Sequence, residues 1–200
     1  MSDSLTKQTK VLLATVEILD VLKYEYFLCN GTLLGIIRDS QLIPWDIDLD
    51  IGVGHEIDKD RLCAEFVNRG YELDDYGAGS NYLALKSKDV KVDFNFFYPR
   101  DQELVTLWQV PRQGFIPQKI ISSLRLLHLP LKLFKWCWTL EGYALPTNQT
   151  LPVSEIEFQG RTVKVPANPE EVLAYTYGKT WRVPKKDYNW RTDGENNARG

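Results

Sequence analysis

Residues 46–51, with the sequence DIDLDI, alternate carboxylates with branched apolar side chains. An alternation of period two is typical of a β-strand, in which successive side chains point to opposite faces. Asp48 and Asp50 are therefore expected on one face, about 7 Å apart by strand rise, with Leu49 on the other face in a core. This pattern constrains the fold most, because it requires a sheet that is buried on one side and carries acids on the other.

The segments around this strand predict a mixed α/β core. Apolar residues at helical spacing predict a first helix over about residues 5–24. A short strand (YFLCN), a turn at Gly31-Thr32 and a helix (LLGIIRD) are expected before the acidic strand. After it, the sequence predicts a helix that Gly70 ends and then three strands, YELDD, NYLALKS and VKVDFNFFY.

Charge and cysteine content indicate which partners and which cellular compartment to expect. The net charge of −3 gives no reason to expect nucleic acid as a partner. Cys29, Cys63 and Cys137 are an odd number without CxxC spacing, which favours a reducing compartment over a disulfide framework or a zinc cluster. No uncharged apolar run approaches the ~18 residues of a membrane-spanning helix, and the first residues lack a signal-peptide pattern. We therefore expect a cytoplasmic protein.

A third acid, Asp93, interrupts the apolar run VKVDFNFF of another predicted strand. An acid on such a strand needs a partner, because an unpaired buried charge is costly. Two interpretations are open: a solvated strand edge with Asp93 in a salt bridge, or carboxylates that hold divalent ions. The wider pattern favours the ions, because the Gly31-Thr32 turn offers N–H groups and a hydroxyl to phosphate oxygens and Arg38 offers a forked cation. We therefore expect two Mg²⁺ or Mn²⁺ ions in phosphoryl-group transfer.

Three separated segments resemble the motifs of one known family. They are GTLLGIIRDSQLIPWDIDLDIG, VKVDFNFFY and YGKTWRVP, at residues 31–52, 90–98 and 177–184. By these segments the chain is similar to the LicD/fukutin family of phosphotransferases, in the nucleotidyltransferase superfamily. The resemblance implies a nucleotidyltransferase-like α/β fold, in which a mixed sheet is flanked by helices.

By the same resemblance Asp48, Asp50 and Asp93 are the metal-binding and catalytic carboxylates. Asp93 is the best placed general base, because an oxygen held between it and a metal ion loses its proton easily. Choline-transferring members read PWDDDID, whereas this chain has Ile47 in place of the middle acid. The difference weakens the expectation of a choline donor and leaves the role of Asp46 open.

The resemblance also assigns contacts with the phosphates of the donor to Gly31, Thr32 and Arg38. For Lys179 two interpretations stay open. In one, Lys179 contacts the same phosphates. In the other, YGKTW closes a helix with a glycine cap, and Trp181 packs back against the core.

The implied reaction is the transfer of a phosphoryl-alcohol, of the phosphocholine or ribitol-phosphate kind, from a CDP-linked donor to a hydroxyl of a glycan or lipid-linked glycan. CMP would be released. Two alternatives remain. An enzyme of the same fold would transfer NMP from an NTP and release pyrophosphate, and a binding module would keep the fold without catalysis. All three carboxylates are present, which favours an enzyme.

The length of 200 residues, with 44% apolar content, is enough for one hydrophobic core. We expect a single domain over residues 1–200, with a catalytic core over about residues 26–98 and a helical or irregular acceptor lobe over about residues 99–192. In this lobe, NPEE at residues 168–171 predicts a helix that Gly178 ends.

Residues 104–140 contain no acid and five basic residues, which gives this segment a charge of +5 in a chain of −3. Tryptophan, phenylalanine and leucine separate the basic side chains. Two interpretations are open: a basic amphipathic helix that packs on the core, or a surface that holds the acceptor and makes a peripheral contact with an anionic membrane.

Overall fold

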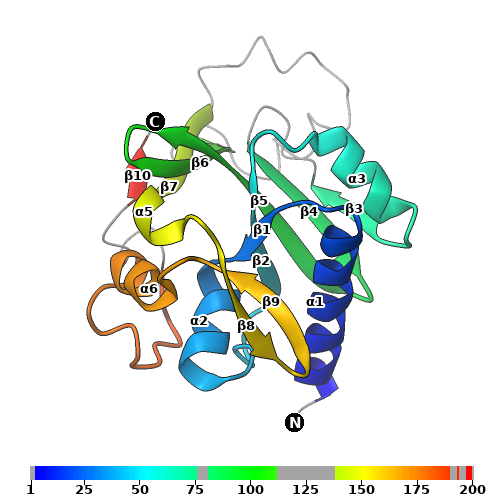
Figure 1. The fold of residues 1–200 in the computed structure, drawn as a ribbon, viewed down its shortest axis with the longest axis horizontal. Helices are drawn as coiled ribbons and strands as arrows, with labels where there is room; N and C mark the ends of the chain where they lie inside the picture. Colours follow the sequence, from blue (N-terminus) through cyan, green and yellow to red (C-terminus); the bar gives the residue numbers. More distant parts are fainter. Residues whose placement is uncertain (1–2, 76–80, 112–137, 190–192, 194–196, 200) are drawn as a thin grey trace.

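The computed structural model describes residues 3–75, 81–111, 138–189, 193 and 197–199 (Figure 1). In these residues, eight strands form one mixed sheet and two more form a small second sheet. The helices are α1 (Asp3–Val21), α2 (Asn30–Asp39), α3 (Lys59–Val67), α5 (Thr147–Thr150) and α6 (Pro169–Tyr177). The large sheet contains β1 (Tyr26–Leu28), β2 (Asp48–Gly54), β3 (Glu72–Asp75), β4 (Tyr82–Ser87), β5 (Val90–Arg100), β6 (Glu103–Pro111), β7 (Trp138–Pro146) and β10 (Asn197–Arg199). The small sheet is the hairpin of β8 (Ser154–Phe158) and β9 (Arg161–Val165).

Strand β5 is the centre of the large sheet. It pairs in parallel with β2 and antiparallel with β4 and β6. The sheet runs in the order β1-β2-β5-β6-β7-β10, and the β3–β4 hairpin joins β5 beside this path. A residue on β5 is therefore inside the sheet, and its neighbours on β2 come from a distant part of the sequence.

Helix α1 and the β8–β9 hairpin lie over one face of the sheet, and α6 lies beside α2 (Figure 1). The hydrophobic core joins these layers. Its fully buried members include Leu12 of α1, Ile51 of β2, Phe94 of β5 and Val163 of β9. Because alternate residues of a strand face opposite sides, burial of Ile51 and Phe94 fixes the direction of the polar residues beside them.

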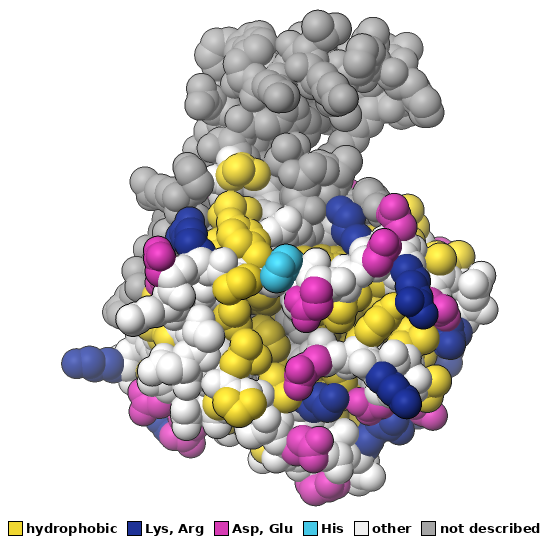
Figure 2. Space-filling view, turned by 45° about the horizontal axis from the view of Figure 1, so that its top comes forward, with side chains coloured by type: hydrophobic (Ala, Val, Ile, Leu, Met, Phe, Trp, Pro, Cys, Tyr) yellow, Lys and Arg dark blue, Asp and Glu magenta, His cyan; other side chains and the backbone are white. Residues whose placement is uncertain are grey.

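The surface carries charges of both signs. On the face shown in Figure 2, acidic and basic side chains are interspersed, and a band of apolar side chains crosses between them. The large exposed apolar residues of the described chain include Trp45 and Ile47, next to the acidic strand, and Val183 after α6.

Most predicted elements are confirmed. The first helix is α1, the acidic strand is β2, and the helix predicted at NPEE is α6, with Gly178 as its C-cap. The segments YELDD, NYLALKS and VKVDFNFFY contain β3, β4 and β5. Strand β5 continues through Pro99 to Arg100, because its last residues form a hairpin with β6.

The turn predicted at Gly31-Thr32 is wrong, since both residues belong to the first turn of α2. The residue before them, Asn30, has a φ of 46°, in the left-handed region. The chain therefore changes direction at Asn30. Glycine is not required at position 31 for this turn.

The interpretation of residues 104–140 as an amphipathic helix is wrong at both described ends. Strands β6 and β7 pair antiparallel there, from Glu103 opposite Pro146 to Pro111 opposite Trp138. None of the helices in the described ranges is long and apolar enough to cross a bilayer. The acceptor or membrane surface stays a prediction, because the basic residues of the segment lie outside the described residues; they are Arg112, Lys119, Arg125, Lys132 and Lys135.

Candidate functional site

Two neighbouring strands bring the predicted carboxylates together. In the parallel ladder of β2 and β5, Asp50 lies directly opposite Asp93. Paired residues of a ladder point to the same face, so the two carboxylates are neighbours, with Asp48 two positions before Asp50. The burial along β2 alternates as the sequence predicts: Leu49 and Ile51 are buried, whereas both aspartates are half-buried.

A fourth acid, Asp46, joins this group from the loop before β2. A Cβ atom on Gly31 would collide with Asp46 Oδ2 and would stand 3.7 Å from Asp50 Oδ2. Position 31 therefore favours glycine because two carboxylates approach its backbone closely. The sequence left the role of Asp46 open, and the structure places it beside the predicted metal-binding residues.

The start of α2 holds Asp50 in two ways. Thr32 Oγ1 accepts a hydrogen bond from the backbone N–H of Asp50 at 2.8 Å, and Asn30 Nδ2 donates one to Asp50 Oδ1 at 3.4 Å. Thr32 is buried, with 2% of its surface exposed. Its hydroxyl thus stabilises the register of α2 against β2, a role that the sequence did not indicate.

The two oxygens of Asp93 have different surroundings. Lys91 Nζ donates to Asp93 Oδ2 at 2.9 Å and to the Tyr82 hydroxyl at 2.7 Å. The salt-bridge interpretation of Asp93 therefore holds for Oδ2. Among the described residues Oδ1 has no hydrogen-bond partner, although Asp93 is only 6% exposed. A buried polar atom without a partner is costly, so a ligand at Oδ1 would stabilise the site.

Burial and mutual repulsion raise the pKa values of these carboxyl groups. Burial, followed by the charge of Asp48, raises the pKa of Asp46 to about 7. Burial raises the pKa of Asp93 to about 6, against the opposing effect of Lys91. The pKa of Asp50 lies well above its ordinary value because of burial and then the charges of Asp48 and Asp93. A cation among such carboxylates would favour their ionised forms.

The donor set fits Mg²⁺ or Mn²⁺ by its chemistry. Its atoms are hard carboxylate oxygens, they repel one another, and Asp93 Oδ1 is buried without a partner in the described residues. As the side chains stand, no three His, Cys, Asp or Glu residues of the described ranges are arranged to ligate a metal ion. Binding would therefore require the carboxylates to turn toward a common point, and metal dependence stays a prediction.

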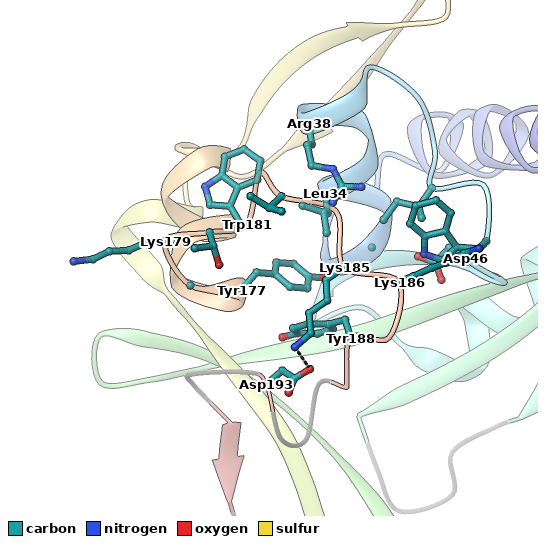
Figure 3. Close-up of a pocket in the computed structure, with 16 residues that line it drawn as sticks. Leu34, Arg38, Asp46, Tyr177, Lys179, Trp181, Lys185, Lys186, Tyr188 and Asp193 are labelled. Carbon is teal, nitrogen blue, oxygen red and sulfur yellow. Dashed lines mark hydrogen bonds and ion pairs between the residues drawn. The ribbon is translucent and has the colours of Figure 1, made fainter.

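A pocket of about 790 Å³ opens beside the carboxylates (Figure 3). One wall comes from α2 and the loop before β2 and includes Gly31, Arg38 and Asp46. The other comes from the end of α6 and the segment after it, and includes Lys179. The fold thus gathers at one pocket three predicted phosphate-binding residues from opposite ends of the sequence, although Thr32 is not among the lining residues.

The two predicted phosphate-binding cations, Arg38 and Lys179, are placed unequally. The Arg38 guanidinium donates to both oxygens of Asp39, from Nε to Oδ1 at 3.0 Å and from Nη2 to Oδ2 at 2.7 Å. A phosphate at Arg38 would have to compete with this ion pair. The side chain of Lys179 extends away from Asp46 (Figure 3).

Two lysines that the sequence analysis did not single out line the second wall. Lys186 Nζ lies over the Trp45 ring, 5.6 Å from its centroid, and Lys185 Nζ pairs with Asp193 at 2.7 Å. Both belong to the stretch PKKDY, whose paired cations beside an aromatic residue are the signal that could have indicated them.

Aromatic side chains complete this second wall. The rings of Tyr177 and Tyr188 lie 5.0 Å apart. The pKa of Tyr177 is well above its ordinary value because of burial and then the charge of Asp50. Tyr177 and Asp46 line the same pocket. We call Tyr177, Lys185, Lys186 and Tyr188 the lysine wall. The helix-end interpretation of YGKTW also holds, since Trp181 is buried after the Gly178 cap.

Comparison with known proteins agrees with this geometry. Residues 23–168 match the family model of the LicD/FKTN/FKRP nucleotidyltransferase domain. The chain is 28% identical over 182 residues to the ribitol-5-phosphate transferase FKTN of Homo sapiens, which covers 89% of this chain and 34% of that protein. The same enzyme from Macaca fascicularis gives the same values. An uncharacterized protein of Rickettsia prowazekii is 41% identical over 61 residues, or 30% of this chain and 23% of that protein.

The chain spans about a third of the length of the FKTN relatives it matches. The matched residues 23–168 include all four aspartates and the first wall of the pocket, whereas the lysine wall follows them. The match covers most of the chain, and the chain therefore belongs to the LicD/FKTN/FKRP nucleotidyltransferase-domain family.

Proposed function

We propose that this chain catalyses the divalent-metal-dependent transfer of a phosphoryl-alcohol from a CDP-linked donor to a hydroxyl of a glycan or lipid-linked glycan. The observation that carries the proposal is the group of carboxylates on β2 and β5, which lies next to Gly31 and Asp46 in the lining of a pocket whose other side is cationic and aromatic. The printed name of the FKTN relatives, ribitol-5-phosphate transferase, supports a phosphoryl-alcohol as the transferred group. Ile47, in place of an acid of choline-transferring members, favours a ribitol-phosphate-like group over phosphocholine.

The pocket is suited to a nucleoside diphosphate. Such a donor has a planar base, which stacks on aromatic rings, and a charged diphosphate, which needs cations. Trp45 is 44% exposed at the rim and carries Lys186 over its ring, so base and phosphate could share this corner of the pocket. The reacting phosphate would then lie near Gly31, beside which Asp46 and Asp50 place their carboxylate oxygens.

Asp48, Asp50 and Asp93 would hold the metal ions, with Asp46 close enough to take part. When bound, the ions would supply positive charge to the diphosphate and to the developing charge on the leaving group. Holding donor and acceptor in line would supply the remainder of the rate acceleration, because it converts a bimolecular reaction into a reaction within one complex.

In the proposed reaction, the acceptor oxygen forms a bond to the phosphorus next to the alcohol, and the bond from that phosphorus to the oxygen of CMP breaks. The proton of the attacking hydroxyl goes to Asp93 Oδ1. This atom suits the role because it is buried and without a hydrogen-bond partner in the described residues. Lys91 holds the other oxygen in place and is itself held by the Tyr82 hydroxyl, which accepts a hydrogen bond from it.

Transfer of NMP from an NTP is the second candidate, since the matching family model is described as a nucleotidyltransferase domain. Incubation with CDP-ribitol, CDP-choline, CDP-glycerol and the four NTPs, with a glycan acceptor and Mn²⁺, separates the two. We expect CMP from a CDP-alcohol and no pyrophosphate. Pyrophosphate from an NTP without CMP release would overturn the first proposal, and neither product in the presence of ligand binding would indicate a binding module.

A further inference from the structure

Asn30 has a strained backbone next to the carboxylates. Its φ of 46° is in the left-handed region, which is uncommon for residues other than glycine. Asparagine tolerates this conformation better than most residues, but glycine would adopt it at lower cost. A residue kept here for its backbone alone would thus be glycine, so the Asn30 side chain is the feature to explain.

The Asn30 side chain joins two distant strands. Its amide nitrogen donates to the Tyr143 hydroxyl at 2.9 Å and to Asp50 Oδ1 at 3.4 Å. Tyr143 belongs to β7, and its ring packs against Phe97 and Trp108 with centroids 5.5 Å and 6.0 Å away. Tyr143 is therefore a fixed point to which Asn30 is tied, and Asn30 in turn reaches the carboxylate.

This arrangement distinguishes the two oxygens of Asp50. Oδ1 accepts from Asn30, whereas Oδ2 is the oxygen nearest to Gly31, 3.7 Å from the Cβ position there. Gly31 lines the pocket. The hydrogen bond from Asn30 thus leaves Oδ2 as the oxygen on the side of Gly31, next to the pocket lining.

We infer that Asn30 and Tyr143 are positioning residues, which orient Asp50 so that its Oδ2 faces the pocket and can bind a divalent cation. Neither residue touches the reacting atoms. The effect on turnover rests on the function proposed above, but the effect on cation binding does not.

Two variants test the pair. Asn30→Gly removes the amide and keeps a residue that accepts the backbone conformation, and Tyr143→Phe removes only the hydroxyl while its ring contacts remain. Tyr71→Phe is the matched control, because the buried Tyr71 hydroxyl also makes a 2.9 Å hydrogen bond, with Thr15, away from the carboxylates. Melting temperatures identify any variant that fails to fold.

The first measurement is the binding of Mn²⁺ alone, by electron paramagnetic resonance. Loss of a hydrogen bond to a metal-binding group costs roughly 10- to 100-fold in affinity or activity, so we expect Asn30→Gly and Tyr143→Phe each to bind Mn²⁺ about tenfold more weakly. The double variant should bind Mn²⁺ only slightly more weakly than the more weakly binding of the two single variants, because both residues act through one contact with Asp50. Tyr71→Phe should bind like the wild type, and Asp50→Asn should lose most of the binding.

The second measurement is steady-state turnover over a range of donor concentrations. We expect kcat to fall in both variants while KM for the donor stays within about twofold, because the pair acts on Asp50 and not on the pocket walls. The inference is overturned if both folded variants bind Mn²⁺ like the wild type, or if Asp50→Asn leaves Mn²⁺ binding intact. If Mn²⁺ binding behaves as expected but no CDP-alcohol is turned over, the positioning role stands and the proposed function fails.

Discussion

The two sides of the pocket are built in different ways. The carboxylate side belongs to the central strands of the sheet, and its side chains are held by backbone and buried side-chain contacts, such as Asp50 with Thr32 and Asn30. The lysine wall begins at the last residue of α6, and its lysines contact other side chains, as in Lys185 with Asp193 and Lys186 with Trp45. A rigid side suits the reaction centre, and a side held by a few exposed contacts can adapt to a substrate.

The contrast between the two sides of the pocket predicts that changes on the carboxylate side lower turnover most. Asp48→Asn, Asp50→Asn and Asp93→Asn should each lower kcat at least ~100-fold without unfolding the protein, because each removes charge that the transition state needs. Asp46→Asn should have a smaller effect. Steady-state kinetics in saturating Mg²⁺ or Mn²⁺ is the measurement, with Asp89→Asn as control, an exposed acid paired with Lys7. Near wild-type turnover in one of the three variants would remove that residue from the site.

Gly31→Ala should have the next largest effect. The added methyl group would collide with Asp46 Oδ2, so the carboxylate must move, and we expect kcat to fall on the order of tenfold. Gly70→Ala is the contrasting variant. Gly70 has open space around it but a φ of 86°, so this change should cost about 1 kcal/mol of stability and leave turnover unchanged. If Gly31→Ala lost only stability, the close approach of the carboxylates would have no part in the reaction.

Changes in the lysine wall should act on binding. A lost charge-assisted hydrogen bond to phosphate corresponds to about a tenfold change, so Lys186→Gln and Lys185→Gln should each raise KM for the donor about tenfold with kcat nearly unchanged. Lys7→Gln is the control, because Lys7 also pairs with an aspartate, at 3.1 Å, but lies away from the pocket. A fall in kcat at constant KM would show that the two sides do not divide binding and catalysis as proposed.

The carboxylate side could be predicted only in part from the sequence. The strand that carries Asp48 and Asp50 was predictable because the alternation with Leu49 and Ile51 is a local pattern that the buried core enforces. The pairing of Asp50 with Asp93 was expected only as a shared site, since ladder register depends on the whole sheet.

Other features depend on the folded arrangement of the side chains and the backbone, and the sequence did not indicate them. The turn predicted at Gly31 was wrong because Asn30 takes the left-handed conformation and Gly31 serves a close approach instead. The ion pair of Arg38 with Asp39 was also not expected, and the contact of Arg38 with phosphate stays a prediction. The contact of Asn30 with Tyr143 spans 113 positions and leaves no local pattern.

The most direct test of the account is the melting temperature of the protein with a CDP-alcohol, measured with and without Mn²⁺. If the carboxylates and the lysine wall hold one donor as its metal complex, the CDP-alcohol should raise the melting temperature only with Mn²⁺, and EDTA should abolish the shift. Asp50→Asn and Arg38→Ala should also abolish it, and Lys186→Gln should reduce it. An equal shift with and without Mn²⁺, unchanged in Asp50→Asn, would contradict the claim that the two sides form one metal-dependent site.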